Sequence, residues 1–184
     1  NSESGYTYSS GYLLMTNTAD RVLVEGIFVT DSYNGHSSYL TAGSLEVKGD
    51  FTQLNTYNYS NAYQNFQASG NHRVLLSGTG QQVVSFASPY VEGSRFNKLE
   101  ITNSSASGVD LASDVVVVSE LVATASKVTN SNRLQLYDKA IISGGSWLYD
   151  LTVGYWTLQQ NQLVKGNLYL NNSILDLNGK TLTI

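Results

Sequence analysis

Aromatic side chains are the residues of this sequence whose type and spacing point most clearly to a chemistry. The chain contains 13 tyrosines and two tryptophans, and several of them gather in two places. A flat aromatic ring can stack on a sugar ring, while a tyrosine hydroxyl and nearby amides can hydrogen-bond to sugar hydroxyls. Both groups therefore predict non-covalent binding of a carbohydrate. The first group is Tyr57, Tyr59 and Tyr63, and the second is Trp147, Tyr149, Tyr155 and Trp156.

A structural reading of the same rings stands beside this one. Tyrosine is an ordinary residue of strand surfaces, so any single ring can serve packing alone. The segment 54–67 (LNTYNYSNAYQNFQ) is polar and rich in tyrosine, which predicts an inserted loop of the kind that often carries function. In the second group we expect one tryptophan in the core and one at the surface, because tryptophan is rarely buried completely.

Residues suited to catalysis or metal binding are sparse. Hydrolysis of a polysaccharide requires two carboxylates that face each other, and the acidic pair Asp110 and Asp114 stands among residues typical of bends. His36 and His72 have no cysteine or carboxylate next to them, whereas zinc requires three or four ligands. We therefore expect no enzymatic activity, no cofactor and no metal, with a polysaccharide lyase or hydrolase as a distant alternative.

Composition excludes further classes of function. Only 13% of the residues are charged and the net charge is -4, whereas a nucleic-acid-binding domain usually carries a basic patch. The chain has no cysteine, which excludes disulfides and thiolate metal sites. Its longest apolar run, Val115–Val118, is far shorter than the ~20 residues of a membrane span. We expect one domain over residues 1–184, no nucleic-acid partner and no insertion into a membrane.

Pairs of apolar residues separated by one residue define the elements that must position these side chains. Two alternate residues of a strand share one face, so each pair predicts a short strand with a buried side. Glycine, asparagine, aspartate and serine lie between the pairs and favour bends, so we expect an all-β fold. The pairs are Leu13/Met15, Val22/Val24, Leu45/Val47, Val74/Leu76, Leu99/Ile101, Val109/Leu111, Val115/Val117, Leu134/Leu136, Leu151/Val153, Leu168/Leu170, Leu175/Leu177 and Leu182/Ile184.

A short repeat indicates how these strands are arranged. Val22–Phe28 (VLVEGIF) and Leu45–Phe51 (LEVKGDF) share the pattern apolar-x-apolar-x-Gly-x-aromatic, and so short a unit must stack on a neighbour. Such strands favour a β-solenoid over an antiparallel sandwich, whose strands are longer and joined by hairpins. With about 22 residues per coil, the chain would form about eight coils. The longer spacing from Gly49 to Gly78 places the inserted loop between them.

Three longer stretches carry a family resemblance. They are Ser69–Ile101 (SGNHRVLLSGTGQQVVSFASPYVEGSRFNKLEI), 108–117 (GVDLASDVVV) and 175–184 (LDLNGKTLTI). Their succession resembles the β-solenoid repeats of large extracellular surface proteins of Gram-positive bacteria, a group that includes adhesin-like proteins and tapirin-like cellulose-binding proteins. The resemblance implies a right-handed parallel β-helix, the usual hand of parallel crossovers, and an extracellular or cell-surface location.

The expected function is that of a non-catalytic binding or adhesion module. Its ligand would be a polysaccharide, or a glycan of a host or cell surface, held by the seven aromatic residues. A purely structural solenoid, as a stalk or filament-forming repeat, is the alternative. Leu182–Ile184 has the pattern of an interior strand and carries no polar cap. Two alternatives follow: end-to-end self-association of the chain, or a chain that is a segment of a larger surface protein.

Overall fold

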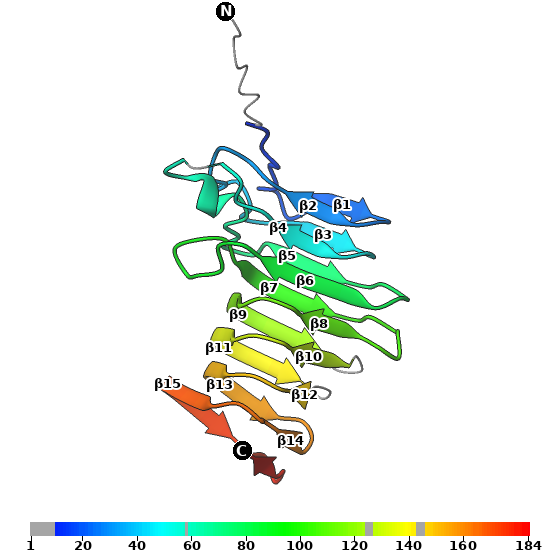
Figure 1. Cartoon of the computed structure of the whole chain (residues 1–184), viewed down its shortest axis with the longest axis vertical. Helices are drawn as coiled ribbons and strands as arrows, with labels where there is room; N and C mark the ends of the chain where they lie inside the picture. The colour runs from blue at the N-terminus through cyan, green and yellow to red at the C-terminus, as the bar shows by residue number, and fades with distance from the viewer. Residues whose placement is uncertain (1–9, 58, 124–126, 143–145) are drawn as a thin grey trace, which may run out of the picture.

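Parallel β-strands provide almost all of the regular structure. The computed structural model describes residues 10–57, 59–123, 127–142 and 146–184. In Figure 1 the strands form a ladder along the long axis of the molecule, from the N-terminal to the C-terminal end. Within the described residues, every element is a strand except one turn of 3-10 helix, η1 (Ala62–Gln64). The all-β prediction is therefore confirmed.

Two large sheets and one small sheet contain all of these strands. The eight-stranded sheet is formed by β1 (Arg21–Val24), β3 (Ser44–Val47), β5 (Arg73–Leu76), β7 (Phe96–Ile101), β9 (Val115–Ala123), β11 (Leu134–Ile142), β13 (Leu151–Leu158) and β15 (Leu168–Asp176). The six-stranded sheet is formed by β2 (Phe28–Thr30), β4 (Phe51–Gln53), β6 (Gln82–Phe86), β8 (Val109–Leu111), β10 (Val128–Asn130) and β12 (Ser146–Trp147). The short strands β14 (Gln162–Leu163) and β16 (Leu182–Thr183) pair with each other.

The chain changes sheets after each strand. Odd-numbered strands follow one another in the first large sheet, and the even-numbered strands β2 to β12 follow one another in the second. Every strand pair that the structure describes is parallel. Parallel neighbours cannot be joined by a tight hairpin, so each returns only after a crossing to the other sheet. The topology is consistent with a β-solenoid and contradicts the antiparallel sandwich.

The repeat found in the sequence corresponds to the register of the strands. Val22 pairs with Leu45, and Leu45 pairs with Val74. The successive copies of the apolar-x-apolar unit are therefore stacked directly upon one another. The uneven spacing of the copies arises in the connections, because the paired strands themselves remain in register.

The core lies between the two large sheets and changes composition along the molecule. In the N-terminal half, the ring of Phe51 packs against four other phenylalanines, at centroid distances of 4.8 to 5.3 Å. Further along, the core is aliphatic and includes two completely buried tryptophans. Alternation along each strand places these side chains in the core, because every second side chain points inward. The phenylalanines around Phe51 are Phe28, Phe66, Phe86 and Phe96.

Buried amides connect successive strands where the chain bends. The Gln82 Nε2 atom donates to the carbonyl oxygens of Val47 (3.0 Å) and Gly49 (2.6 Å). The Oε1 atom of the same side chain accepts from the Gly78 N–H and from Asn103 Nδ2, at 2.8 and 2.9 Å. A buried polar group is stable only when it is hydrogen-bonded, and this side chain has a described partner for both of its polar atoms.

Both ends of the ladder expose apolar side chains. At the C-terminal end, β15 is the outermost strand of the large sheet, and Ile174 is 61% exposed. At the N-terminal end, β1 is outermost and Leu23 is 53% exposed. The backbone groups along the free side of such an edge strand are available for pairing. Across the described part of the chain, no helix has both the length and the apolar character that crossing a membrane demands.

Three long connections join consecutive strands in the N-terminal half of the described chain, and one of them contains the loop that the sequence predicted. The predicted insertion, 54–67, is part of the connection 54–72 between β4 and β5. Two more long connections, 31–43 and 87–95, lie on either side of it in chain order and join β2 to β3 and β6 to β7. The predicted loop is therefore one of three neighbouring connections of similar kind.

Candidate functional site

The three long connections emerge on the same side of the molecule. Each one leaves the C-terminal end of an even-numbered strand, and β2, β4 and β6 are neighbours in one parallel sheet. In Figure 1 these connections project together beside the N-terminal half of the ladder. The equivalent connections further along, such as 112–114 and 131–133, are only short bends. The topology therefore concentrates loop surface in one region.

These loops carry two stacked pairs of tyrosines. The rings of Tyr33 and Tyr59 lie 3.9 Å apart with an angle of 20° between their planes. Tyr63 and Tyr90 stack at 5.6 Å and 19°, while Tyr57 meets Tyr33 edge-on at 6.3 Å. We call these five residues the tyrosine loop cluster. It draws at least one ring from each of the three loops.

Two rings of the tyrosine loop cluster are open to solvent. Tyr59 is 49% exposed and Tyr90 is 45% exposed. Tyr33, Tyr57 and Tyr63 are partly buried beside them. Partial burial, and then the proximity of Tyr63, raises the pKa of the Tyr90 phenol, which is protonated at neutral pH in any case and can donate a hydrogen bond. The exposed rings thus combine flat apolar area with a polar group at the ring edge.

Hydrogen bonds between the loops hold the tyrosines in place. Asp31 in the first loop accepts from the backbone N–H and the hydroxyl of Thr56 in the second. Gln64 and Gln67 in the second loop each donate to the carbonyl oxygen of Glu92 in the third, both at 2.9 Å. The three loops are therefore joined to one another by hydrogen bonds between their side chains and backbone.

The tryptophan-containing group does not form a surface site. Trp147 and Trp156 are both fully buried, so the expectation that one of them lies at the surface was wrong. Trp147 lies in β12 and donates from Nε1 to Gln162 at 3.1 Å, while Trp156 lies on the inward face of β13. Both rings fill the aliphatic half of the core. Tyr149 and Tyr155 are exposed, at 50% and 39%, but no described aromatic ring pairs with either.

Sequence reasoning found Tyr57, Tyr59 and Tyr63 but missed Tyr33 and Tyr90 as members of the same site. Tyr33 and Tyr90 belong to other loops, and they join the cluster only because β2, β4 and β6 are adjacent. The signal that could have found them is the pairing register, which brings the ends of consecutive copies of the repeat together.

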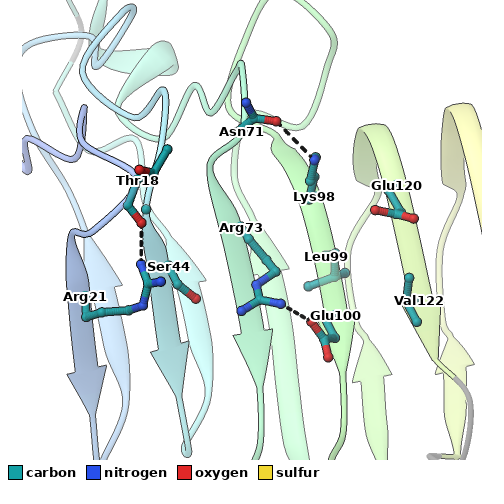
Figure 2. Close-up of a pocket in the computed structure, with 11 residues that line it drawn as sticks. Thr18, Arg21, Ser44, Asn71, Arg73, Lys98, Leu99, Glu100, Glu120 and Val122 are labelled. Carbon is teal, nitrogen blue, oxygen red and sulfur yellow. Dashed lines mark hydrogen bonds and ion pairs between the residues drawn. The ribbon is translucent and has the colours of Figure 1, made fainter.

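A second feature is a shallow groove on the outer face of the eight-stranded sheet. Its volume is about 300 Å³, and Figure 2 shows the side chains that line it across β1, β3, β5, β7 and β9. Arg21, Arg73 and Lys98 contribute three positive charges. Two carboxylates, Glu100 and Glu120, lie on the same wall. Sequence reasoning did not identify this groove, because its residues come together only through the register of five strands.

Each carboxylate of the groove has a cation of its own. Glu100 accepts from Arg73 at 2.6 Å, as Figure 2 shows. Glu120 lies 3.5 Å from the ammonium group of Lys139, which stands on the next strand. Among the described residues, neither Arg21 nor Lys98 forms an ion pair with a carboxylate. The groove therefore contains two cations that a ligand can approach.

Asp110, Asp114 and His72, which were considered as catalytic or metal-binding residues, are held by hydrogen bonds, by an ion pair or by burial within the fold. Asp110 accepts from the hydroxyls of Thr129 (2.8 Å) and Ser131 (3.0 Å), and Asp114 pairs with Arg133 at 2.9 Å. Within the part of the chain that the structure describes, no three histidine, cysteine or acidic side chains gather as a metal site. Burial lowers the pKa of His72 to about 4, which keeps this imidazole neutral near pH 7.

Comparison of the chain with protein-family models, with curated proteins and with solved structures returns no match. The functional argument therefore rests on the two surface features themselves. A fold of this kind would in any case leave the function open, because function resides in sites that are carried by folds.

Proposed function

We propose that this protein is a non-catalytic extracellular module that binds a polysaccharide or a surface glycan through the tyrosine loop cluster. The scaffold would be a right-handed β-solenoid of about eight coils. The alternation of the chain between two parallel sheets and the eight strands of the larger sheet support that architecture. The usual right-handedness of parallel crossovers supports the hand.

The observation that carries the proposal is the stacked pair of Tyr33 and Tyr59, whose ring centroids are 3.9 Å apart. Tyr33 occupies one face of the Tyr59 ring, and Tyr59 nevertheless remains 49% exposed. The Tyr59 ring is held by stacking on Tyr33, and its loop is held by hydrogen bonds to the neighbouring loops. A sugar ring can therefore stack on the exposed part of this ring at little entropic cost. Tyr90 supplies a second exposed ring on the adjacent loop.

Truncation of the platform tests the proposal. We expect Tyr59→Ala and Tyr90→Ala to weaken binding to the glycan that the wild-type protein retains, by roughly tenfold each, because each removes aromatic contact area. The measurement is pull-down on insoluble cellulose and other insoluble polysaccharides, together with a glycan array. Tyr137→Ala is the matched control, since Tyr137 is 46% exposed in β11, outside the loops.

The proposal fails if the wild-type protein binds none of these glycans, or if Tyr137→Ala weakens binding as much as Tyr59→Ala does. A reducing-sugar or unsaturated-product signal during the incubation would also overturn the non-catalytic assignment. These outcomes separate binding from catalysis without any assumption about which sugar is recognised.

The second candidate function is a structural solenoid that associates end to end. The observation that favours it is the uncovered edge of the large sheet at its C-terminal end, where Leu170 of β15 is 54% exposed although its partner Val153 in β13 is fully buried. A parallel edge can add a further strand from another molecule. Light scattering over a range of concentrations tests this candidate. A mass that rises with concentration supports it, and a constant monomer mass rejects it.

A further inference from the structure

We propose that the groove shown in Figure 2 binds the anionic groups of an acidic polysaccharide, one that carries carboxylates or sulfates. This inference rests on the proposed function, since it takes a polysaccharide as the ligand and adds a charge class to it. The groove lies on the outer face of the eight-stranded sheet and is distinct from the tyrosine loop cluster. It shares one connection with that cluster, because Asn71 in its lining belongs to the loop 54–72.

The first argument is the state of its cations. Arg21 donates from Nη1 to the carbonyl oxygens of Thr18 and Asp20, both at 2.7 Å, and Lys98 donates to the amide oxygen of Asn71 at 3.1 Å. These partners are neutral, so they orient the two cations without neutralising them. An arginine has five N–H donors and a lysine has three, so each side chain retains donors for a ligand. Charge-assisted bonds of this kind favour carboxylate and sulfate oxygens.

The second argument concerns the carboxylates, which would repel an anion if they were unpaired. Glu100 is bound to Arg73, and Glu120 lies between Lys139 outside the groove and Lys98, its partner in register on β7, so neither acidic group is unpaired. The lining of the groove then holds three cations against two carboxylates, which leaves a net positive charge. This is a local excess in a chain whose net charge is -4.

The third argument is that the cations form a row across neighbouring strands, parallel to the long axis of the molecule. Arg21, Ser44, Arg73 and Lys98 occupy equivalent positions on β1, β3, β5 and β7. Neighbouring strands lie about 4.8 Å apart, so the row from Arg21 to Lys98 spans roughly 14 Å along the axis of the ladder. A row of this length suits a linear polymer with repeated anionic groups better than it suits one small anion.

The test compares three soluble oligosaccharides of similar length by isothermal titration calorimetry with the whole chain. They are an oligogalacturonate with carboxylates, a chondroitin sulfate oligomer with sulfates, and a neutral cello-oligosaccharide. We expect at least one acidic oligomer to bind about tenfold more tightly than the neutral one, with an affinity that falls as salt is added. The tighter of the two acidic ligands identifies the anionic group. Equal affinity for the neutral oligomer, or no effect of salt, overturns the proposal.

Substitutions locate the site. We expect the double variant Arg21→Ala, Lys98→Ala to bind the acidic oligomer at least about tenfold more weakly, because two charged contacts are lost. The matched control is Lys165→Ala, Lys180→Ala, which removes the same charge from exposed positions near the C-terminal end. If the control weakens binding equally, the attraction is a property of the net charge and the groove is not the site.

A gain of affinity provides a test that misfolding cannot imitate. Glu100→Gln releases Arg73 from its ion pair, and we expect it to strengthen binding of the acidic oligomer roughly threefold. Glu25→Gln is the control, because it also removes one negative charge and releases a cation, Lys48, outside the groove. Strengthening by both variants, or by neither, contradicts the proposal.

Failure of this inference can be distinguished from failure of the proposed function. If Tyr59→Ala abolishes binding while the double variant of Arg21 and Lys98 has no effect, the groove is rejected and the tyrosine loop cluster stands. If the double variant abolishes binding of the acidic oligomer while Tyr59→Ala has no effect, the groove stands and the tyrosine platform is rejected.

Discussion

His72 is a buried imidazole whose two nitrogen atoms have no hydrogen-bond partner among the described residues. It packs edge-on against Phe66, with ring centroids 5.9 Å apart. Burial disfavours the charged form and lowers the pKa from its ordinary 6.5 to about 4. The side chain therefore behaves as part of the apolar core at neutral pH.

This lowered pKa makes the stability of the fold depend on pH. The unfolded chain takes up a proton near pH 6.5 and the folded chain only near pH 4, so stability is full above pH 6.5 and declines between the two values. The loss amounts to roughly 3 kcal/mol, since one pKa unit corresponds to about 1.4 kcal/mol. We expect His72→Leu to remove most of this decline, as measured by urea unfolding at pH 7 and pH 4.

The comparison between wild type and variant isolates His72. His36 is also buried with a lowered pKa, but it is present in both proteins, so its contribution cancels in the difference. A decline of unchanged size in His72→Leu would show that another group causes it.

At the scale of the residue, the sequence predicted the location of the tyrosines better than the burial of the tryptophans. Tyr57, Tyr59 and Tyr63 were expected in a loop because their neighbours are polar, and the structure places them there. Trp147 and Trp156 each lie beside other apolar residues, and Trp156 follows a register shift in β13, so the sequence pattern does not specify which of these side chains points inward. Their complete burial depends on the size of the cavity between the sheets, which is a property of several strands.

The bend that follows β3 is an element at which successive repeats lie very close together. Gly49 follows β3 and lies against the equivalent bend of the preceding repeat. A Cβ atom added there would lie 2.6 Å from the carbonyl carbon and oxygen of Gly26. Gly26 occupies the same position of the repeat, one copy earlier, and a Cβ atom on it would meet nothing within 4 Å. Neither glycine has a positive φ, so the two positions differ in space and not in backbone conformation.

This contrast gives a paired prediction. We expect Gly49→Ala to lower the free energy of unfolding by roughly 1–3 kcal/mol, because the contacted backbone atoms can move only with their strand. Gly26→Ala should change it by less than about 0.5 kcal/mol. Urea unfolding of both variants measures the difference. Equal destabilisation would mean that backbone entropy, and not the close approach at Gly49, accounts for the effect.

The strands were the elements most predictable from sequence. Pairs such as Leu45/Val47 and Val74/Leu76 became β3 and β5 with both members buried, because alternation in a strand is a local property. The pair Leu13/Met15 formed no strand, and Met15 contributes only an isolated bridge to Leu40. The loops were less predictable, because the side of the molecule on which they meet is decided by pairing between distant segments.

At the scale of the whole molecule, each strand is supported chiefly by its two neighbours in the sheet. Strands β5 and β7 have partners on both sides, whereas β15 has only β13 and leaves the inward-facing Leu170 54% exposed. In such a linear arrangement local opening begins where neighbours are missing. Stability should therefore fall towards the ends.

Amide hydrogen exchange measures this gradient. At protein concentrations where the chain is monomeric, we expect the amides of β15 and β16 to exchange at least about tenfold faster than those of β5 and β7. Equal protection of β15 and β5 under those conditions would contradict the prediction, and would indicate that the exposed edge is covered.

The register of the large sheet also decides how the molecule can change in length. Leu134 pairs with Val115 on one side and with Leu151 on the other. Removal of residues 134–150 would join Arg133 to Leu151 and place Leu151 opposite Val115, in the pairing that Leu134 now makes. The alternation of inward and outward side chains would be preserved. One whole turn, and not one residue, is therefore the natural unit of insertion and deletion in this fold, and chains of different length can share one cross-section and one set of loops.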